Sequence, residues 1–425
     1  MKKTITILMA SALALASCMT LDFYPHNAIS RYDVGDENID LFYYGLYNCS
    51  QYKPGTDGYY MKDIAGGDLR RGGSSGAGMS VKDMIQQLQI PSSGFINGPW
   101  TSYYAWLYQV NCFILSANDL SDTHSYKKKY LGTAYFFRGL IYYNLTSLWR
   151  EVPIIDTPTN ASVPKNSEAE CWAFTEENIR LAIELLEDFD GDNTYLSKQA
   201  AQALMARTCL AQGKMEEAEQ YAEAVIKSGH FALDTYANIW DGDTNKEVIF
   251  CYANTGADEN GVQMANVFRG APTYIPTTEF ESLVLTNDER FPYLAFADGV
   301  NITFNKYNTY GGYDPIVVAR LSEMYLISAE AKGRADGLAR LNELRTKRGL
   351  AKLANIDTDD DFIDAILAER RLELATEGFR WFDLARTGRI ETIGLDKKYA
   401  VMPIPETQIE RSNGILTQNP LWITQ

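Results

Sequence analysis

The stretch SKQAAQALMARTCLAQGKMEEAEQYAEAVIKS, residues 197–228, decides the fold of this chain. Its apolar spacing predicts one helix over 197–212 and a second over 215–228, separated by a turn at Gly213 and Lys214. Small side chains on both helices allow the two backbones to approach closely: Ala203, Ala206, Ala218 and Ala222. The segment is therefore interpreted as a helical hairpin.

Helical periodicity recurs on both sides of this hairpin. Four helices are predicted before it, over residues 36–48, 100–120, 127–149 and 167–188. Three more are predicted after it, over residues 316–333, 337–348 and 361–384. Helical pairs that recur about every 34 residues are typical of tetratricopeptide repeats. The sequence therefore predicts a predominantly α fold, in which tetratricopeptide-like hairpins stack into a solenoid-like scaffold.

Two regions interrupt the helical pattern. Residues 66–78 are rich in glycine and predict a loop. Residues 231–315 combine glycines and prolines with short β-type runs at 248–252 and 301–304, which predicts loops and small hairpins. We expect an irregular insert to be carried by the helical scaffold.

The N-terminus has the pattern of an export signal. Lys2 and Lys3 precede an apolar run at 5–16, which is too short to span a bilayer, and Cys18 follows small residues. A cysteine at this place resembles the lipobox of bacterial lipoproteins, in which the thiol takes a diacylglycerol. We therefore expect a signal peptide over 1–17, a membrane anchor at Cys18, and a single domain over 18–425.

Composition restricts the partners of the mature chain. The formal net charge is −16, and loss of Lys2 and Lys3 with the signal peptide brings it to −18. Such a chain repels phosphate backbones, so we expect no nucleic-acid partner. The 27 tyrosines suit a protein that binds by ring stacking and hydroxyl contacts, although many will be core residues.

The candidate motifs for catalysis and metal binding each depart from the pattern or context that the chemistry requires. Residues 72–76 fit GxSxG, but arginines precede them where a nucleophile elbow needs a buried strand. Asp241, Asp243 and Asn245 begin a calcium-loop pattern, yet Lys246 stands where glycine is required, which indicates a polar turn. The three histidines are scattered, so we expect no metal site and no cofactor.

Two glutamates are the strongest candidates for acid–base chemistry. On a continuous helix, Arg370, Glu373, Glu377 and Arg380 share one face. A catalytic carboxylate pair is one interpretation. The arginines favour the ionised form of both glutamates, which makes them poor general acids at neutral pH. We therefore interpret the row as structural ion pairing, with no catalytic residue.

Several segments together resemble the SusD/RagB family of nutrient-binding outer-membrane lipoproteins of Bacteroidota. They occur in the order expected for the family: AYFFRGL at 134–140, LWREVP at 148–153, RLSEMYL at 320–326, LNELR at 341–345, ERRLE at 369–373, EGFRWFDL at 377–384, and PIP at 403–405 before QNP at 418–420. Arg150 and Glu151 stand where the family often has glycine and aspartate. Residues 19–23 lack the acidic cluster that often directs such lipoproteins to the outer face.

The resemblance implies a SusD-like scaffold over about 127–230 and 316–390, with ligand-bearing loops over about 50–100 and 252–315. It also implies a ligand site of aromatic rings with polar neighbours. The residues of this chain that match those stretches are Asp68, Arg70, Arg71, Asn97, Trp100, Tyr274, Tyr307 and Tyr310. Tyr307 and Tyr310 lie in a loop rich in glycine and asparagine, where we expect exposure. Trp100 is equally compatible with a buried position at the start of its helix.

By the same resemblance, the protein is expected at the outer membrane, lipid-anchored and at the cell surface. It would bind oligosaccharides without catalysis and work with a SusC-like TonB-dependent transporter. A RagB-like peptide receptor is an alternative, because Arg70 and Arg71 suit a carboxylate. A surface glycoside hydrolase and a tetratricopeptide scaffold with only protein partners are further alternatives.

Overall fold

The computed structural model describes residues 34–73, 79–241, 244–255 and 261–423. The predicted signal peptide, Cys18 and residues 19–23 lie outside the described residues. Among the described helices, none combines the length and hydropathy needed to cross a membrane.

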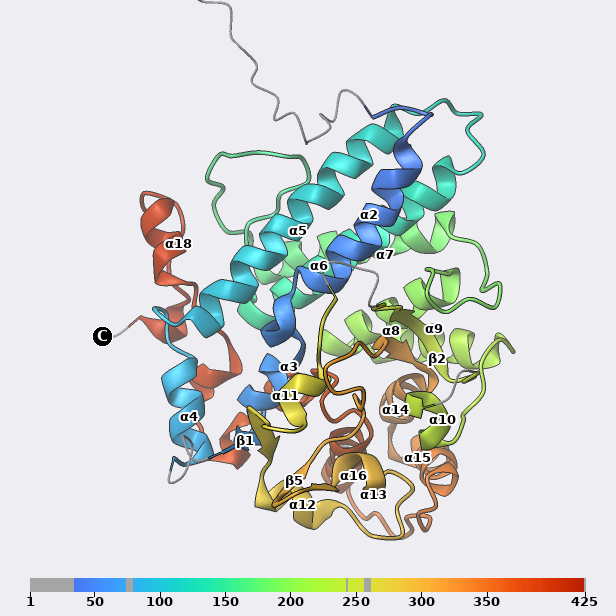
Figure 1. Cartoon of the computed structure of the whole chain (residues 1–425), viewed down its shortest axis with the longest axis vertical. Helices are drawn as coiled ribbons and strands as arrows, with labels where there is room; N and C mark the ends of the chain where they lie inside the picture. Colours follow the sequence, from blue (N-terminus) through green and yellow to red (C-terminus); the bar gives the residue numbers. More distant parts are fainter. Residues whose placement is uncertain (1–33, 74–78, 242–243, 256–260, 424–425) are drawn as a thin grey trace, which may run out of the picture.

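Long helices build most of the molecule, as predicted (Figure 1). The N-terminal half contains α2 (Ile39–Tyr52), α3 (Gly55–Ala65), α4 (Val81–Leu88), α5 (Gly94–Asn118), α6 (Lys127–Trp149), α7 (Glu168–Leu185), α8 (Lys198–Ala211) and α9 (Met215–Lys227). The C-terminal half contains α14 (Leu321–Ala331), α15 (Gly333–Lys347), α16 (Asp359–Glu373), α17 (Arg380–Arg386) and α18 (Glu406–Arg411).

The α8–α9 pair is the hairpin that the sequence predicts. The Ser197 side chain caps α8 by accepting a hydrogen bond from the Ala200 N–H, and Gly213 makes the turn with a φ of +72°. The four alanines of the hairpin are fully buried, which lets the helices pack closely. In turn α6 packs on α7, α7 on α8, α9 on α14, and α14 on α15. This order of neighbours is the stacking of a helical solenoid.

Gly337 shows how tightly α14 and α15 pack. A Cβ atom at this position would lie 1.9 Å from the carbonyl oxygen of Ala329, so an alanine has no room. We expect Gly337→Ala to lower the free energy of unfolding by about 2 kcal/mol or more in urea denaturation. Gly45→Ala is the matched control, because that helical glycine has open space around it and should gain slightly. A neutral Gly337→Ala would contradict this packing.

Short helices and strands form the insert between α9 and α14, and strand β1, which lies between α3 and α4, pairs with one of the insert's strands. The helices are α10 (Tyr236–Asp241), α11 (Ala265–Phe268), α12 (Thr278–Leu283) and α13 (Phe291–Leu294). The strands pair antiparallel: β1 (Leu69–Arg71) with β3 (Tyr274–Pro276), β2 (Val248–Tyr252) with β6 (Ile316–Arg320), and β4 (Phe296–Asp298) with β5 (Asn301–Thr303). Both predicted strands are confirmed, and β4–β5 is a local hairpin.

Three expectations for secondary structure are wrong. Residues 316–320 form strand β6 rather than the start of a helix, because they pair with β2. Residues 69–71 form β1 within the predicted glycine-rich loop, because they pair with β3. The predicted helix over 361–384 is broken after Glu373, and its second part begins again as α17.

The helix break between α16 and α17 has a clear local cause. Thr376 and Gly378 adopt positive φ angles of 63° and 80°, which end the helix. The Gly378 N–H donates to Asp63 Oδ2 at 3.0 Å, so α3 holds the turn in place. Glu373 and Glu377 therefore do not share one helix face.

Candidate functional site

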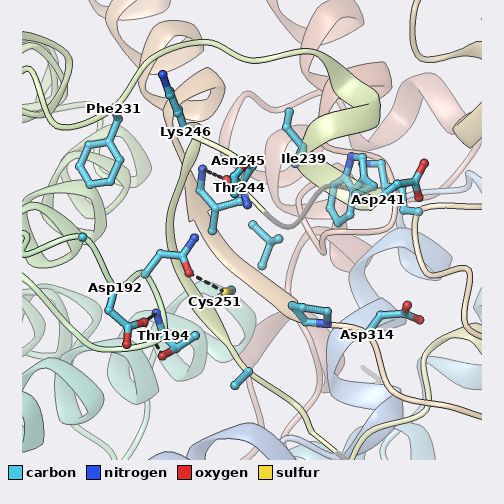
Figure 2. Close-up of a pocket in the computed structure, with 18 of the residues that line it drawn as sticks. Asp192, Thr194, Phe231, Ile239, Asp241, Thr244, Asn245, Lys246, Cys251 and Asp314 are labelled. Carbon is cyan, nitrogen blue, oxygen red and sulfur yellow. Dashed lines mark hydrogen bonds between the residues drawn. The ribbon is translucent and has the colours of Figure 1, made fainter.

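A cavity of about 1020 Å³, which we call the groove, opens between the helical scaffold and the insert (Figure 2). Its floor is the β2–β6 sheet, where Val248, Cys251 and Val317 line the cavity. Its walls are the loop after α7, helix α10 with the residues that follow it, and the segment before β6. The polar and charged residues that line it are Asp192, Asn193, Thr194, His230, Asp241, Thr244, Asn245, Lys246, Lys306, Asn308, Thr309 and Asp314.

Hydrogen bonds hold α10 in position on its wall. The Asp234 carboxylate accepts from the backbone N–H groups of Thr235 (2.8 Å) and Lys246 (3.0 Å) and from Asn238 Nδ2 (2.8 Å). Burial raises the pKa of Asp234, but these hydrogen bonds outweigh it and lower that pKa overall. The loop that carries α10 is thus fastened at both ends.

Asp241 joins α10 to the rest of the insert. Its carboxylate accepts hydrogen bonds from the Tyr293 hydroxyl and from Asn308 Nδ2. Across the groove, Asp192 Oδ1 accepts from the Thr194 N–H and hydroxyl at 2.9 and 2.6 Å, and the Asn193 carbonyl accepts from the Cys251 N–H at 2.9 Å. The polar wall is therefore fixed before any ligand arrives.

Aromatic rings complete the lining of the groove. Trp240 is half-buried and packs with its ring centre 4.9 Å from Lys306 Nζ and 5.9 Å from the ring of Tyr307. Tyr313 and the pair Phe189 and Phe231 line other parts of it. Apolar ring faces beside carboxylate and amide groups can hold a ligand that presents both hydroxyl groups and CH surfaces.

The structure brings several of the predicted ligand residues together around the segment 269–276. Arg71 pairs with Tyr274 in the β1–β3 ladder, and Arg70 Nε donates to the Pro276 carbonyl at 3.1 Å. Tyr310 is 61% exposed and its ring lies against Gly270. Tyr274 itself is buried, at 9% exposure, and we call Arg70, Arg71 and Tyr310 the loop surface. Their role in ligand binding stays a prediction.

Asp68 is buried and directly precedes β1. Its Oδ1 accepts from Arg371 at 2.7 Å, and Arg380 lies nearby at 4.0 Å. Burial raises the pKa of Asp68 although both arginines oppose the rise. In this arrangement its carboxylate joins β1 to α16 and α17.

The remaining predicted residues lie elsewhere. Trp100 is only 3% exposed and packs edge-on against Trp149, while Asn97 accepts hydrogen bonds from Thr407 and Gln408 near α18. The expectation that Tyr307 is exposed is wrong: it is 3% exposed because its ring packs under Trp240. The structure therefore does not join these three side chains to the loop surface.

Glu373 and Glu377 lie in a buried charge network. We use this name for the acidic and basic side chains that form ion pairs with these two glutamates or with their partners. Glu373 accepts from Arg290 at 3.0 Å, from Arg348 at 2.8 Å and from Arg320. Glu377 accepts from Arg320 at 2.8 Å and from Lys306 at 2.6 Å. The further members are Glu247, Asp288, Glu369 and Arg345.

The network explains the ionisation of both glutamates. Burial alone raises their pKa values, but the surrounding cations outweigh it and lower the pKa of Glu377 and, much further, that of Glu373. The prediction that arginines keep them charged is right, but the arginines come from other elements. Arg370 instead pairs with Asp383 at 2.7 Å. These buried, fully engaged carboxylates have the character of structural ions.

No cluster of three or more His, Cys, Asp or Glu side chains in the described ranges has the geometry to hold a metal ion. The groove residues were missed at the sequence level. In the sequence, Asp241 and Asn245 form only an incomplete calcium-loop pattern, and Trp240, directly before Asp241, is the one signal of an aromatic ring beside a polar turn.

Comparison with known protein families decides the relationship. The model of the SusD family matches residues 157–400, which is more than half of the chain. The chain belongs to the SusD family. A second family model, described as "Starch-binding associating with outer membrane", matches residues 21–210 of this SusD family member.

Individual relatives agree with that assignment. SusD-like protein P2 of Formosa agariphila is 23% identical, and the match covers 99% of this chain and all of that protein. A crystal structure of a SusD superfamily protein from Bacteroides thetaiotaomicron superposes with a TM-score of 0.78 at 23% identity, covering 91% of this chain and 100% of that one. Surface glycan-binding protein A of the same species, solved with laminarihexaose, gives 0.77 at 19% identity over 91% and 99%. The SusD fold is thus shared throughout.

Proposed function

We propose that this protein is a non-catalytic glycan-binding lipoprotein. It captures oligosaccharides and delivers them to a SusC-like TonB-dependent transporter. The groove carries the proposal, because its volume suits an oligosaccharide and its lining combines Trp240 and Tyr313 with fixed carboxylates and amides. Membership of the SusD family supports it, as does the laminarihexaose bound by a protein of the same fold.

The membrane anchor is part of the same proposal. Cys18 takes the lipid, and the protein is held at the surface of the outer membrane. The description of the second matching family, which associates with the outer membrane, supports this location. A tethered receptor that is close to its transporter needs only moderate affinity, because the tether raises the effective concentration of bound ligand at the pore.

The absence of catalysis is proposed from the state of the acids. Glycoside hydrolysis needs a carboxylic acid that is protonated at working pH and reaches the scissile bond. The side chains of Glu373 and Glu377 are buried, and neighbouring cations hold both ionised. The groove carboxylates Asp192, Asp241 and Asp314 accept hydrogen bonds from neighbouring side chains, which suits them to hold sugar hydroxyls.

Isothermal titration calorimetry with a panel of oligosaccharides and peptides tests the proposal. Released reducing ends are measured in the same samples. We expect at least one oligosaccharide to bind, no peptide to bind, and no reducing ends to form. Binding of peptides alone would establish a RagB-like receptor instead. Release of reducing ends that is lost in Glu373→Gln or Glu377→Gln without unfolding would establish a hydrolase.

A further inference from the structure

A second cavity, of about 90 Å³, lies within the helical scaffold and is separate in its chemistry from the groove. It is bounded by α3, α5, α6, α8, the turn after α16 and the β2–β6 sheet, whose Val317 also lines the groove. The side chains that matter here are Lys62, Trp106, Tyr143, Asn144, Arg207 and Glu377. A cavity needs roughly 10–15 Å³ to hold one water, so this one has room for a small solute.

Lys62 is a buried cation without an acidic partner. It is 7% exposed, and its Nζ donates to the neutral Asn144 Oδ1 at 2.7 Å. Within the described residues no carboxylate forms an ion pair with it. Lys306, another buried lysine, shows how such a charge is usually compensated: its Nζ forms an ion pair with Glu377 at 2.6 Å. A buried charge without a counter-charge is costly.

The charges around Lys62 do not supply the missing anion. Arg207 lines the same cavity, and its own charge is balanced by Glu323 at 2.6 Å. Glu377 also lines it, but its two oxygens already accept from Arg320 and Lys306. Asp63, next to Lys62 in α3, accepts from the Gly378 N–H, and burial raises its pKa well above the ordinary value.

An unused donor lines the same cavity. Trp106 is 1% exposed, and its Nε1–H has no hydrogen-bond partner in the described structure. Buried indole N–H groups usually find an acceptor. Burial, followed by the field of Arg207, lowers the pKa of Lys62 to about 7, so an anion bound beside the amine would stabilise its charged form.

We propose that this cavity binds one small monovalent anion of the halide class, held by the Lys62 ammonium and the Trp106 indole N–H. A sugar ring is too large for a space of about 90 Å³, so a glycan cannot be the occupant of this cavity. The anion would supply the counter-charge and the acceptor that these two donors lack. Its expected effect is on the stability of the scaffold around α3.

Thermal unfolding in different sodium salts tests the site. The protein is unfolded in 10–500 mM sodium bromide or sodium chloride and, at equal ionic strength, in sodium gluconate, whose anion is too large to enter. We expect the halides to raise the midpoint by about 2–3 °C over gluconate. Lys62→Met should abolish this difference, whereas Lys128→Met, at an exposed position on α6, should keep it.

Two results would overturn the proposal: an equal midpoint in halide and gluconate for the unmodified protein, or a halide effect that persists in Lys62→Met. Where Lys62→Met does not fold, crystals of the unmodified protein soaked in sodium bromide decide the question. An anomalous bromide peak beside Lys62 Nζ supports the site, and a cavity without such a peak refutes it.

Discussion

Replacing Glu373 with alanine is expected to lower the free energy of unfolding by about 3–5 kcal/mol, the cost of breaking a buried ion pair from one side. The substitution removes the carboxylate that Arg290, Arg320 and Arg348 share. All three guanidinium groups are fully buried, so water cannot replace the lost partner. Urea denaturation followed by far-ultraviolet circular dichroism measures the change.

Glu343→Ala is the matched control for this experiment. Glu343 forms an ion pair with Arg340 at 2.7 Å, but its side chain is 53% exposed. Water compensates for such a loss, so the control should change stability by less than about 1 kcal/mol. Equal effects of the two substitutions would show that the buried charge network does not stabilise the fold.

The same network sets the acid sensitivity of the protein. The folded-state pKa of Glu373 lies well below that of an unfolded glutamate, which is about 4.3. Its contribution to stability is therefore complete above that value and is lost as the pH falls towards the folded-state pKa. Glu373→Ala lacks this contribution, so the gap in stability between the two proteins should narrow below about pH 4.

The second large effect is expected on ligand binding. Trp240→Ala together with Asp314→Ala should weaken the binding of an oligosaccharide identified by calorimetry by about 30-fold or more, because a central tryptophan typically contributes about 2 kcal/mol. Both side chains line the groove. Titration calorimetry measures the loss, and the thermal midpoint verifies that the variant is folded.

Arg70→Ala together with Tyr310→Ala is the comparison variant for the groove. These residues belong to the loop surface and do not line the groove. We expect this variant to retain most of its affinity. Loss of binding here, with the groove variant unaffected, would move the ligand site to the loop surface that the family resemblance predicts.

The sequence predicts the helical scaffold well because local patterns decide it. Helix α6 has the predicted bounds, and each end of α8 and α9 lies within one residue of its predicted position. The sequence does not predict the break after Glu373: the positive φ angles of Thr376 and Gly378 end the helix locally, but the contacts that hold this turn, from Asp63 and Arg320, come from distant parts of the chain. Strand β6 was missed for the same reason, since its partner β2 precedes it by more than 60 residues.

The candidate site was less predictable than the scaffold. Side-chain type and loop composition identify Tyr307 and Tyr310 equally, yet one ring is buried under Trp240 and the other is exposed. Which side of a loop faces solvent depends on contacts made after the chain has folded. The groove itself is assembled from four separate segments between residues 189 and 317, so no single sequence motif could predict it.

Lys306 links the two main features of this molecule. Its ammonium group is fastened inside the charge network to Glu377 and to the carbonyls of Glu373 and Ala375, while the next residues along the chain form one wall of the groove. A ligand entering there meets a surface that has already lost its conformational freedom during folding. Binding then costs little ordering entropy, so a few weak contacts to the sugar suffice for capture. The same rigid wall lets the ligand leave without rearrangement of the receptor.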